Sequence, residues 1–524
     1  MRYSAETIAP IKLRQLGFYL ALLVAWASDA AAAKPFDFSV VAERARQLAA
    51  EDYQPPPAAP QVMRDLGYDE FQRIRSDPDK ALWRDYGSRF ELMPMITGLY
   101  FKHAVKLNVV TPQGVQALPF SRDYFKVDSA ELAKKVPADA GFAGFKLTYP
   151  LNKPTVQDQF MVFAGASYFR AVGKGDGFGL SARGLAVDTG EASGEEFPSF
   201  VEYWLIKPPA GADRFRLYAL LDGKRVTGAY EFTIHPGKPT RVDVRSMLFP
   251  RKKIGMLGVA PLTSMFFYGE NTPRPPGEWR PEVHDSDGLQ ILGGSGEWLW
   301  NPLHNPMRLH TQAFSVDEPR GFGLIQRDRA FGHYQDPEAQ YQQRPSAWVI
   351  PQGKWEPGRV VLVKIPTDSE TNDNIVAFWS PLAPVEEGRP LRFDYRLLFG
   401  DSDIAGGDVG RSVASYVGRG DVIGGGDKPG TYRVVVDFRG GRLDELVPGT
   451  KVAVDATAQE GGELLERQVR YLPESRVWRV SLLARPAEKK PLALRVALRG
   501  EQGAMSETWT YTLPVPNAIV GEGK

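Results

Sequence analysis

Carboxyl groups gather in two short polar segments of the sequence, residues 280–288 and 368–374. Each segment comes directly before an apolar run, residues 289–292 and 375–379, which predicts a loop at the mouth of a strand. Hydrolysis of a glycosidic bond uses two carboxyl groups, one to protonate the leaving oxygen and one to activate water or attack carbon. The residue types alone do not choose among the candidate acids, which are Glu282, Asp285, Asp287, Asp368, Glu370 and Asp373.

Tryptophans are concentrated in the same part of the chain. Residues 279–379 hold six of the 11 tryptophans and four of the six histidines. Because side chains alternate along a strand, Trp298 and Trp300 are expected on one face, as a sugar-stacking platform requires. If the second strand extends back to Asp373, then Trp379 shares a face with that acid. The alternative is that these tryptophans form a β-sandwich core and that the acids are solvated turn residues.

Several other chemistries are not supported by the sequence. The chain has no cysteine, which excludes disulfides, thiolate nucleophiles and cysteine-based metal sites. The glycine-rich segment 173–179 reads as a β-turn, and residues 285–288 lack the later acidic ligand of a calcium loop. We therefore expect neither a cofactor nor a metal ion. With 64 basic and 63 acidic residues and no long basic run, nucleic acid is not an expected partner.

The acid segments must be positioned by a scaffold of many short strands. Helical spacing of apolar residues predicts a helix over residues 36–51, and a second short helix is expected at 66–75. From about residue 90 onward, short alternating runs separated by Gly, Pro, Asn and Asp predict a mainly β protein with antiparallel strands. Clear examples are residues 106–110, 144–147, 159–163 and 214–221.

A glycine-rich stretch at residues 401–430 is the clearest boundary in the sequence. It separates an expected β-sandwich domain at 34–400 from an expected immunoglobulin-like domain at 431–524. The second domain is predicted from regularly spaced short strands. These strands are expected at residues 432–438, 451–456, 466–471, 478–483, 492–498 and 508–513.

The first 33 residues have the pattern of a cleavable export signal. Isolated basic residues precede an apolar run at 16–27, and Ala30 to Ala33 supply small residues for cleavage. The apolar run is short compared with the ~20 residues that span a bilayer. We therefore expect an exported protein that is located in the periplasm of a bacterium.

Long motifs in one order resemble the periplasmic glucan biosynthesis proteins of the G and D types. The likeness covers essentially the whole chain after the leader. The motifs that carry it are residues 141–147 (GFAGFKL), 166–184, 193–197 (SGEEF), 258–267 (GVAPLTSMFF), 280–289 (RPEVHDSDGL), 293–302, 321–329, 344–348 (RPSAW), 370–379 (ETNDNIVAFW) and 506–509 (SETW).

This resemblance implies a fold, a substrate and a partner. The fold is a large N-terminal antiparallel β-sandwich of the galactose mutarotase-like kind, followed by an immunoglobulin-like β-sandwich. The substrate is β-1,2-glucan, the backbone of osmoregulated periplasmic glucans, and a membrane glucan glucosyltransferase is the functional partner. The leader lacks a twin-arginine pair, which favours the G type and export by the general secretory route.

The resemblance also implies roles for individual residues. It makes Asp373 the general acid and Asp285 the general base of an inverting glycoside hydrolase that cleaves β-1,2-glucan internally. It places Tyr341, Arg344 and Glu370 in the site, and which carboxylate Arg344 approaches stays open. The alternative function is a non-catalytic protein that binds nascent glucan and presents it to branching or modifying enzymes.

Overall fold

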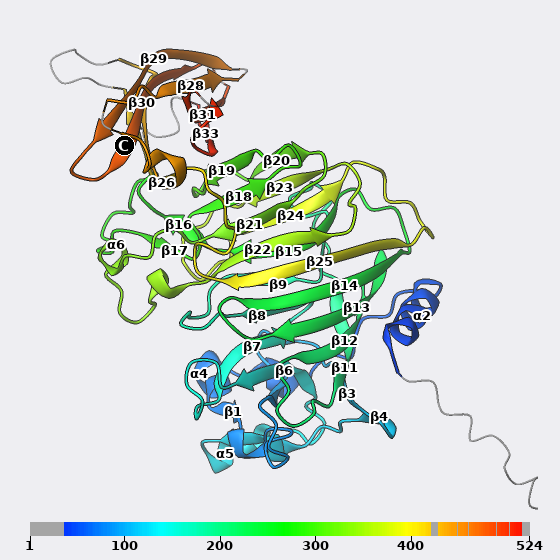
Figure 1. The fold of residues 1–524 in the computed structure, drawn as a ribbon. Helices are drawn as coiled ribbons and strands as arrows, with labels where there is room; N and C mark the ends of the chain where they lie inside the picture. The colour runs from blue at the N-terminus through cyan, green and yellow to red at the C-terminus, as the bar shows by residue number, and fades with distance from the viewer. Residues whose placement is uncertain are drawn as a thin grey trace, which may run out of the picture.

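The computed structural model describes residues 36–420, 428–447, 449–459, 461–488, 490–501 and 503–515 (Figure 1). The expected export signal, residues 1–33, lies outside these residues. The described chain is built mainly from antiparallel strands, which confirms the predicted fold class. None of the helices in this described part is both long and apolar enough to cross a membrane.

One large sheet has 10 strands, and β10 (Leu185–Val187) pairs with β15 beside its main path. The path runs through β2 (Glu91–Ile96), β6 (Phe142–Tyr149), β7 (Asp158–Ala164), β8 (Tyr168–Ala171), β9 (Ser181–Arg183), β15 (Leu257–Ser264), β24 (Ile375–Pro381), β23 (Gly358–Lys364) and β20 (His310–Val316).

A second sheet has 15 strands, and β32 (Gly503–Ala504) pairs with β31 beside its main path. The path runs through β28 (Ala453–Ala458), β31 (Leu492–Gly500), β33 (Thr508–Leu513), β19 (Trp298–Pro302), β18 (Gly288–Leu292), β21 (Gly321–Ile325), β22 (Ser346–Gln352), β25 (Leu391–Gly400), β14 (Thr240–Pro250), β13 (Val226–His235), β12 (Phe215–Asp222), β11 (Ser199–Ile206), β3 (Lys106–Thr111) and β4 (Gly114–Ala117).

Aromatic side chains fill the space between these two sheets. The ring of Phe163 on β7 lies 5.3 Å from that of Phe232 on β13, and Trp379 on β24 lies 5.7 Å from Phe393 on β25. These rings belong to one continuous buried core. Because burial of apolar surface is the main favourable contribution to folding, this core fixes the two sheets face to face.

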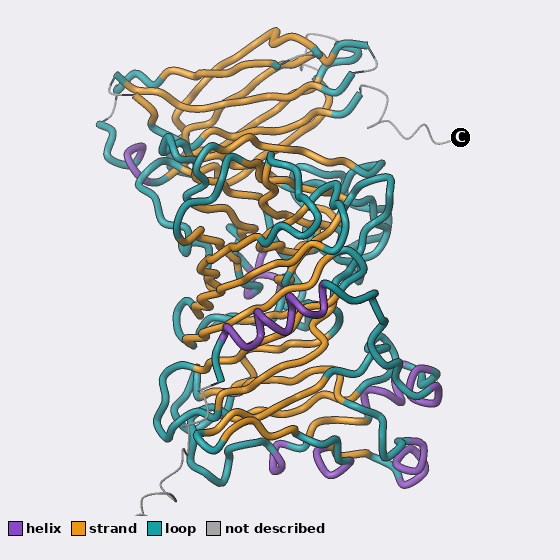
Figure 2. The backbone as a smooth tube through the Cα atoms, turned by 90° about the vertical axis from the view of Figure 1, so that its right-hand side faces the viewer, coloured by secondary structure: helices purple, strands orange, loops and turns teal. Residues whose placement is uncertain are grey.

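Helix α2 (Phe38–Ala49) lies across the outer face of the larger sheet, over strands β12 to β14 (Figure 2). Phe38, Val41 and Ala45 form its buried stripe, which is the helical spacing that the sequence predicts. Asp37 caps the N-terminus by accepting the backbone N–H of Ser39 at 2.8 Å. The predicted first helix is therefore confirmed.

The second predicted helix, at residues 66–75, is only partly correct. Helix α4 covers Tyr68–Gln72, and the chain then enters strand β1 (Ile74–Ser76), which pairs with β5 (Phe125–Val127). Pairing with a distant strand overrides the local helical pattern there. The remaining short helices are α3 (Gln61–Arg64), α5 (Ala130–Lys135), α6 (Phe331–Tyr334), η1 (Pro78–Lys80), η2 (Arg122–Tyr124), η3 (Tyr341–Gln343) and η4 (Gly441–Leu443).

The C-terminal strands form one end of the molecule (Figure 1). A sheet of four strands has the order β26 (Arg411–Arg419), β27 (Tyr432–Arg439), β30 (Val477–Pro486) and β29 (Gly462–Leu472). All six predicted C-terminal strands are present, and the expected linker at 401–430 contains β26. The C-terminal strands β28, β31 and β33 continue the larger sheet, because β33 pairs with β19 in parallel. The domain boundaries stay a prediction.

Candidate functional site

Asp285 lies between strand β17 (Val283–His284) and strand β18, and its side chain is buried. Its backbone N–H donates to the carbonyl of Met265 at 2.9 Å. The Nε of Arg344 lies 3.6 Å from Oδ1 of Asp285, which shows the carboxylate that this arginine approaches. Burial raises the pKa of Asp285 to about 6, with the charge of Asp373 adding to the rise and Arg344 opposing it.

Asp373 lies in the loop directly before strand β24, which begins at Ile375. The strand therefore does not extend back to this acid, and the face that was expected to join Asp373 to Trp379 does not form. Asp373 is about a third exposed, and its Oδ2 lies 3.5 Å from the guanidinium of Arg170 on β8. Arg170 is held in place by donating to the hydroxyl of Ser181 at 2.6 Å.

One dipeptide, Met265–Phe266, holds the two acid loops together. Asp285 is bonded to the carbonyl of Met265. On the other side, Asn374 accepts the N–H of Phe266 at 2.8 Å and donates to its carbonyl at 3.0 Å. Since Asn374 is next to Asp373 in the chain, two carboxyl groups that are far apart in sequence flank the same backbone unit. Strand β16 (Phe266–Tyr268) and its partner β17 position this unit at one edge of the molecule (Figure 1).

Glu370 belongs to a second polar group in the same site. Its Oε2 accepts the hydroxyl of Tyr341 at 2.8 Å and the guanidinium of Arg280 at 2.7 Å. Burial, together with this bond to Glu370, raises the pKa of the Tyr341 phenol, so the phenol stays neutral. The guanidinium of Arg344 lies 5.2 Å from the centre of the Tyr341 ring and donates to the carbonyl of Phe178. The structure thus brings all five of the predicted polar residues to this site.

The structure adds two arginines that sequence reasoning missed, Arg280 and Arg170. Arg280 also bonds Asp336 at 3.1 Å and Glu278 at 2.8 Å, so it holds three loops together. The sequence did offer an indication of Arg280, because this residue is the first of the acid segment at residues 280–288. Arg170 had no such signal, since only the pairing of β8 with β9 brings it near the acid loop.

The three tryptophans predicted to line the site do not reach it. Trp379 is fully buried and packs against Trp355 at a centroid distance of 4.9 Å. Trp298 stacks on Trp348 at 5.9 Å, and Trp300 is buried in the core shared with the C-terminal strands. The period-two alternation put these rings on common faces, but those faces point into the protein. The alternative that they are core residues is the one that the structure supports.

His284, next to Asp285, is a buried cation. Its Nε2 faces the carboxylate of Glu282 at 2.9 Å, and its Nδ1 faces Oε1 of Gln326 at 3.1 Å. The Nε2 of Gln326 donates to other oxygens, so both imidazole nitrogens of His284 meet acceptors and must carry protons. Burial alone would lower the pKa of His284, but Asp287 and Glu282 outweigh it and raise the pKa to about 9.

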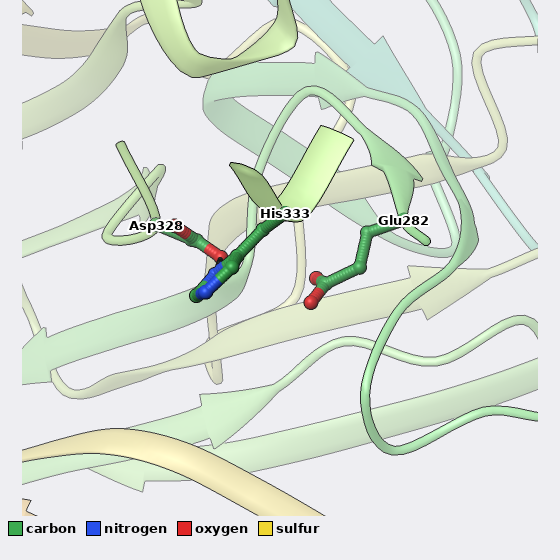
Figure 3. Close-up of side chains that lie close together, drawn as sticks. All are labelled: Glu282, Asp328 and His333. Carbon is green, nitrogen blue, oxygen red and sulfur yellow. Dashed lines mark hydrogen bonds and ion pairs between the residues drawn. The ribbon is translucent and has the colours of Figure 1, made fainter. Parts of the chain in front are cut away.

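Glu282, Asp328 and His333 converge on one small space (Figure 3). Their potential ligand atoms all lie within 4.8 Å of one another, and carboxylate and imidazole are ligands that zinc accepts. Each acid already has an imidazole partner, however: Glu282 bonds His284, and Asp328 bonds His333. The hydrogen bond to Asp328 raises the pKa of His333, which disfavours the neutral imidazole that a metal ion needs. As it stands, the group is an ion-pair network.

A cavity of about 60 Å³ lies beside this network, between the β16–β17 segment and strand β26. Glu270 faces it and accepts the N–H of Ser415 at 3.1 Å. The dense protein surroundings of the Glu270 carboxyl raise its pKa to about 8, with the charges of Glu282 and Asp287 adding to the rise, although the residue keeps an exposed surface. The cavity is therefore acidic and is walled partly by the C-terminal sheet.

The fold and the site thus define a protein with a cluster of carboxylates at one edge of a mainly β scaffold. Comparison with known proteins shows its family. The profile of the family described as periplasmic glucan biosynthesis protein, MdoG, matches residues 36–513. The chain is also 46% identical over 495 residues to the Glucans biosynthesis protein G of Ralstonia nicotianae. This alignment covers 93% of this chain and 98% of that protein.

This chain therefore belongs to the MdoG family of periplasmic glucan biosynthesis proteins. The family resemblance and its G type, both expected from the sequence motifs, are confirmed. The protein acts in the biosynthesis of periplasmic glucans and is located in the periplasm.

Proposed function

We propose that this protein cleaves the β-1,2-glucan backbone internally by an inverting mechanism, with Asp373 as general acid and Asp285 as general base. The observation that supports this most directly is the anchoring of both acid loops to Met265–Phe266. Glycoside hydrolysis needs two carboxyl groups that flank the scissile bond, and this anchoring brings together the loops that carry Asp285 and Asp373. The backbone to be cleaved is the product of a membrane glucosyltransferase, delivered to the exported protein.

The environment of Asp285 suits a base. With a pKa of about 6 it is mostly ionised at pH 7, yet it is more basic than an ordinary aspartate. The Nε of Arg344, 3.6 Å from Oδ1, restricts the orientation of the Asp285 carboxylate. Asp373 must hold a proton when glucan is bound. Asp373 is partly exposed in the free protein, so a bound glucan can reach this side chain directly.

The test is to incubate purified protein with linear β-1,2-glucan and to measure the distribution of glucan chain lengths afterwards. We expect wild type to shorten the chains and Asp373→Asn to lower the rate by at least about 100-fold, the usual loss when a general acid is removed. Asp368→Asn is the matched control, because Asp368 is an exposed acid of the same loop. Proton NMR of the first products should show the inverted anomer.

Two results would contradict the hydrolytic mechanism. Wild type could leave the glucan length unchanged, or Asp373→Asn could shorten it as fast as wild type does. Products that retain the anomeric configuration would contradict inversion alone, because a retaining pair of carboxyl groups forms a covalent intermediate instead.

A second function, glucan binding without cleavage, is favoured by one contact. The guanidinium of Arg170 lies 3.5 Å from Oδ2 of Asp373, so in the free protein this acid already has a cationic partner. In this case the protein receives nascent glucan and presents it to branching or modifying enzymes. It then binds linear β-1,2-glucan without forming product, and Asp373→Asn leaves the affinity within about threefold of wild type.

A further inference from the structure

Trp279 is exposed to an unusual degree for a tryptophan. Its exposed fraction is 62%, whereas tryptophan side chains in folded proteins are buried on average. Among the tryptophans in the part of the chain that the structure describes, Trp279 alone exposes most of its surface. It lies between strands β16 and β17, in the loop that leads into the first acid segment.

The backbone around Trp279 is held by hydrogen bonds to one carboxylate and by several prolines. The Oε1 of Glu278 accepts the backbone N–H groups of Trp279 at 3.0 Å and Arg280 at 3.1 Å. The side chain of Arg280 bonds the same carboxylate, and this bond lowers the pKa of Glu278 to about 2. Prolines at positions 273, 275, 276 and 281 restrict the backbone further. A loop whose backbone is already held in place loses little conformational entropy when a ligand binds to it.

Arg280 joins this loop directly to the acid site. Its Nη1 donates to Glu370 at 2.7 Å and to Asp336 at 3.1 Å. The hydroxyl of Tyr268 donates to the Arg280 carbonyl at 3.1 Å and fixes the backbone from the other side. The Arg280 guanidinium, which contacts Glu370, lies 6.0 Å from the centre of the Trp279 ring, so the indole forms part of the rim of the site.

Carboxylates are the main hydrogen-bond acceptors at this rim. Three of them, Glu278, Asp336 and Glu370, surround the guanidinium of Arg280. Such acceptors suit a ligand whose hydroxyl groups donate hydrogen bonds. An exposed flat ring beside such acceptors can cover the apolar face of a pyranose. A neutral sugar fits both features.

We propose that the indole of Trp279 is a stacking platform for one glucose ring of a bound β-1,2-glucan, at the rim of the acid site. This inference rests on the proposed function only in its choice of glucan as the ligand, since stacking needs no cleavage. It assigns to Trp279 the role for which the sequence pattern had suggested Trp298 and Trp300.

The experiment measures affinity in the absence of turnover. Isothermal titration with linear β-1,2-gluco-oligosaccharide is carried out on the full chain carrying Asp373→Asn. We expect Trp279→Ala in this background to raise Kd about tenfold, and Trp279→Phe, which keeps a flat ring, to stay within about threefold. Tyr471→Ala is the matched control, because Tyr471 is an exposed ring (45%) on β29 of the C-terminal sheet, and its Kd should not change.

The outcomes separate this inference from the proposed function. If the Asp373→Asn protein binds the oligosaccharide and Trp279→Ala binds it equally well, the stacking role of Trp279 is wrong. If wild type binds glucan but forms no product, the hydrolytic function is wrong. The stacking role of Trp279 is then decided only by the ratio of the Kd values with and without Trp279→Ala. If neither wild type nor the Asp373→Asn protein binds linear β-1,2-glucan, both proposals are overturned. Equal loss of affinity in Trp279→Ala and Tyr471→Ala would also overturn the stacking role.

Discussion

Asp285 is the residue on which opposing electrostatic effects meet. Burial and the charge of Asp373 favour its neutral form, while Arg344, Arg170 and the imidazolium of His284 favour its ionised form. Burial has the larger effect, so the pKa of Asp285 rises to about 6. The folded protein thus stores an unfavourable charge at neutral pH, as sites that tune a catalytic group commonly do.

This balance gives a testable pH dependence of stability. The folded pKa of Asp285, about 6, lies above its ordinary value of 3.8. The folded state therefore binds this proton more tightly, and the resulting stabilisation is present below about pH 4 and is lost as pH rises through 6. A shift of this size corresponds to about 3 kcal/mol. Between pH 4 and 7, wild type should lose that much stability relative to Asp285→Asn in urea unfolding.

Asp368→Asn is the control for this pH dependence, because Asp368 is exposed. Its unfolding free energy should follow the wild-type curve across the same pH range. If the curves of wild type and Asp285→Asn run parallel from pH 4 to 7, burial does not raise the pKa of Asp285 as described.

At the scale of elements, the site depends on how two loops are tied to one short strand. The side chain of Asn374 exchanges two hydrogen bonds with the backbone of Phe266 and donates a third to the carbonyl of Ile365 at 3.0 Å. The Asn374 side chain is buried, and its amide satisfies the N–H and carbonyl of Phe266 as a neighbouring strand would. The loop that carries Glu370 and Asp373 is held by this amide.

Asn374→Ala should therefore loosen the acid loop. It leaves the N–H and carbonyl of Phe266 without these partners in a buried position, which costs about 1–3 kcal/mol per group. We expect a loss of about 3 kcal/mol in unfolding free energy by denaturant titration, together with weaker glucan binding. Asn372→Ala is the control in the same loop, because Asn372 is exposed and bonds only Thr367 at 3.2 Å, and it should change stability by less than about 0.5 kcal/mol. Equal stability of both variants would show that Asn374 does not tether the loop.

The strands were predictable from the sequence because period-two alternation is a local property. Their pairing was not, since β24 pairs with β15 from a distant part of the chain and Arg170 reaches Asp373 only through that sheet. Alternation also could not say which face points inward, so Trp379 was expected at the site and is in the core. One physical reason for the inward position of Trp379 is its contact with Gly358. A Cβ at Gly358 would approach the Trp379 ring to 2.4 Å, so the ring can pack there only because this residue has no side chain. The roles of Asp285 and Asp373 came from the family resemblance and stay a prediction.

At the scale of the whole molecule, the C-terminal strands are attached through both backbone and side chains. Strand β33 pairs with β31 on one side and with β19 on the other, so one sheet continues into the C-terminal part. Beside that junction, both nitrogens of the Arg327 fork bond the buried Glu507, at 2.6 and 2.8 Å. Arg327 also donates to the carbonyl of Ser412 on β26 at 2.8 Å and lies over the Trp300 ring at 3.4 Å. Three segments therefore meet at one ion pair.

Glu507→Gln should test whether this junction makes the molecule unfold as one unit. Gln keeps the shape but leaves the guanidinium of Arg327 buried without its counter-charge, which costs about 3–5 kcal/mol. We expect thermal unfolding of wild type to show one transition, which the variant moves as a whole to lower temperature, because a shared sheet couples the two parts. Glu463→Gln, which breaks the exposed pair with Arg485, should change stability by less than about 1 kcal/mol. Two separate transitions, with Glu507→Gln shifting only one of them, would show instead that the C-terminal part folds and unfolds independently of the sheets that hold the acid site.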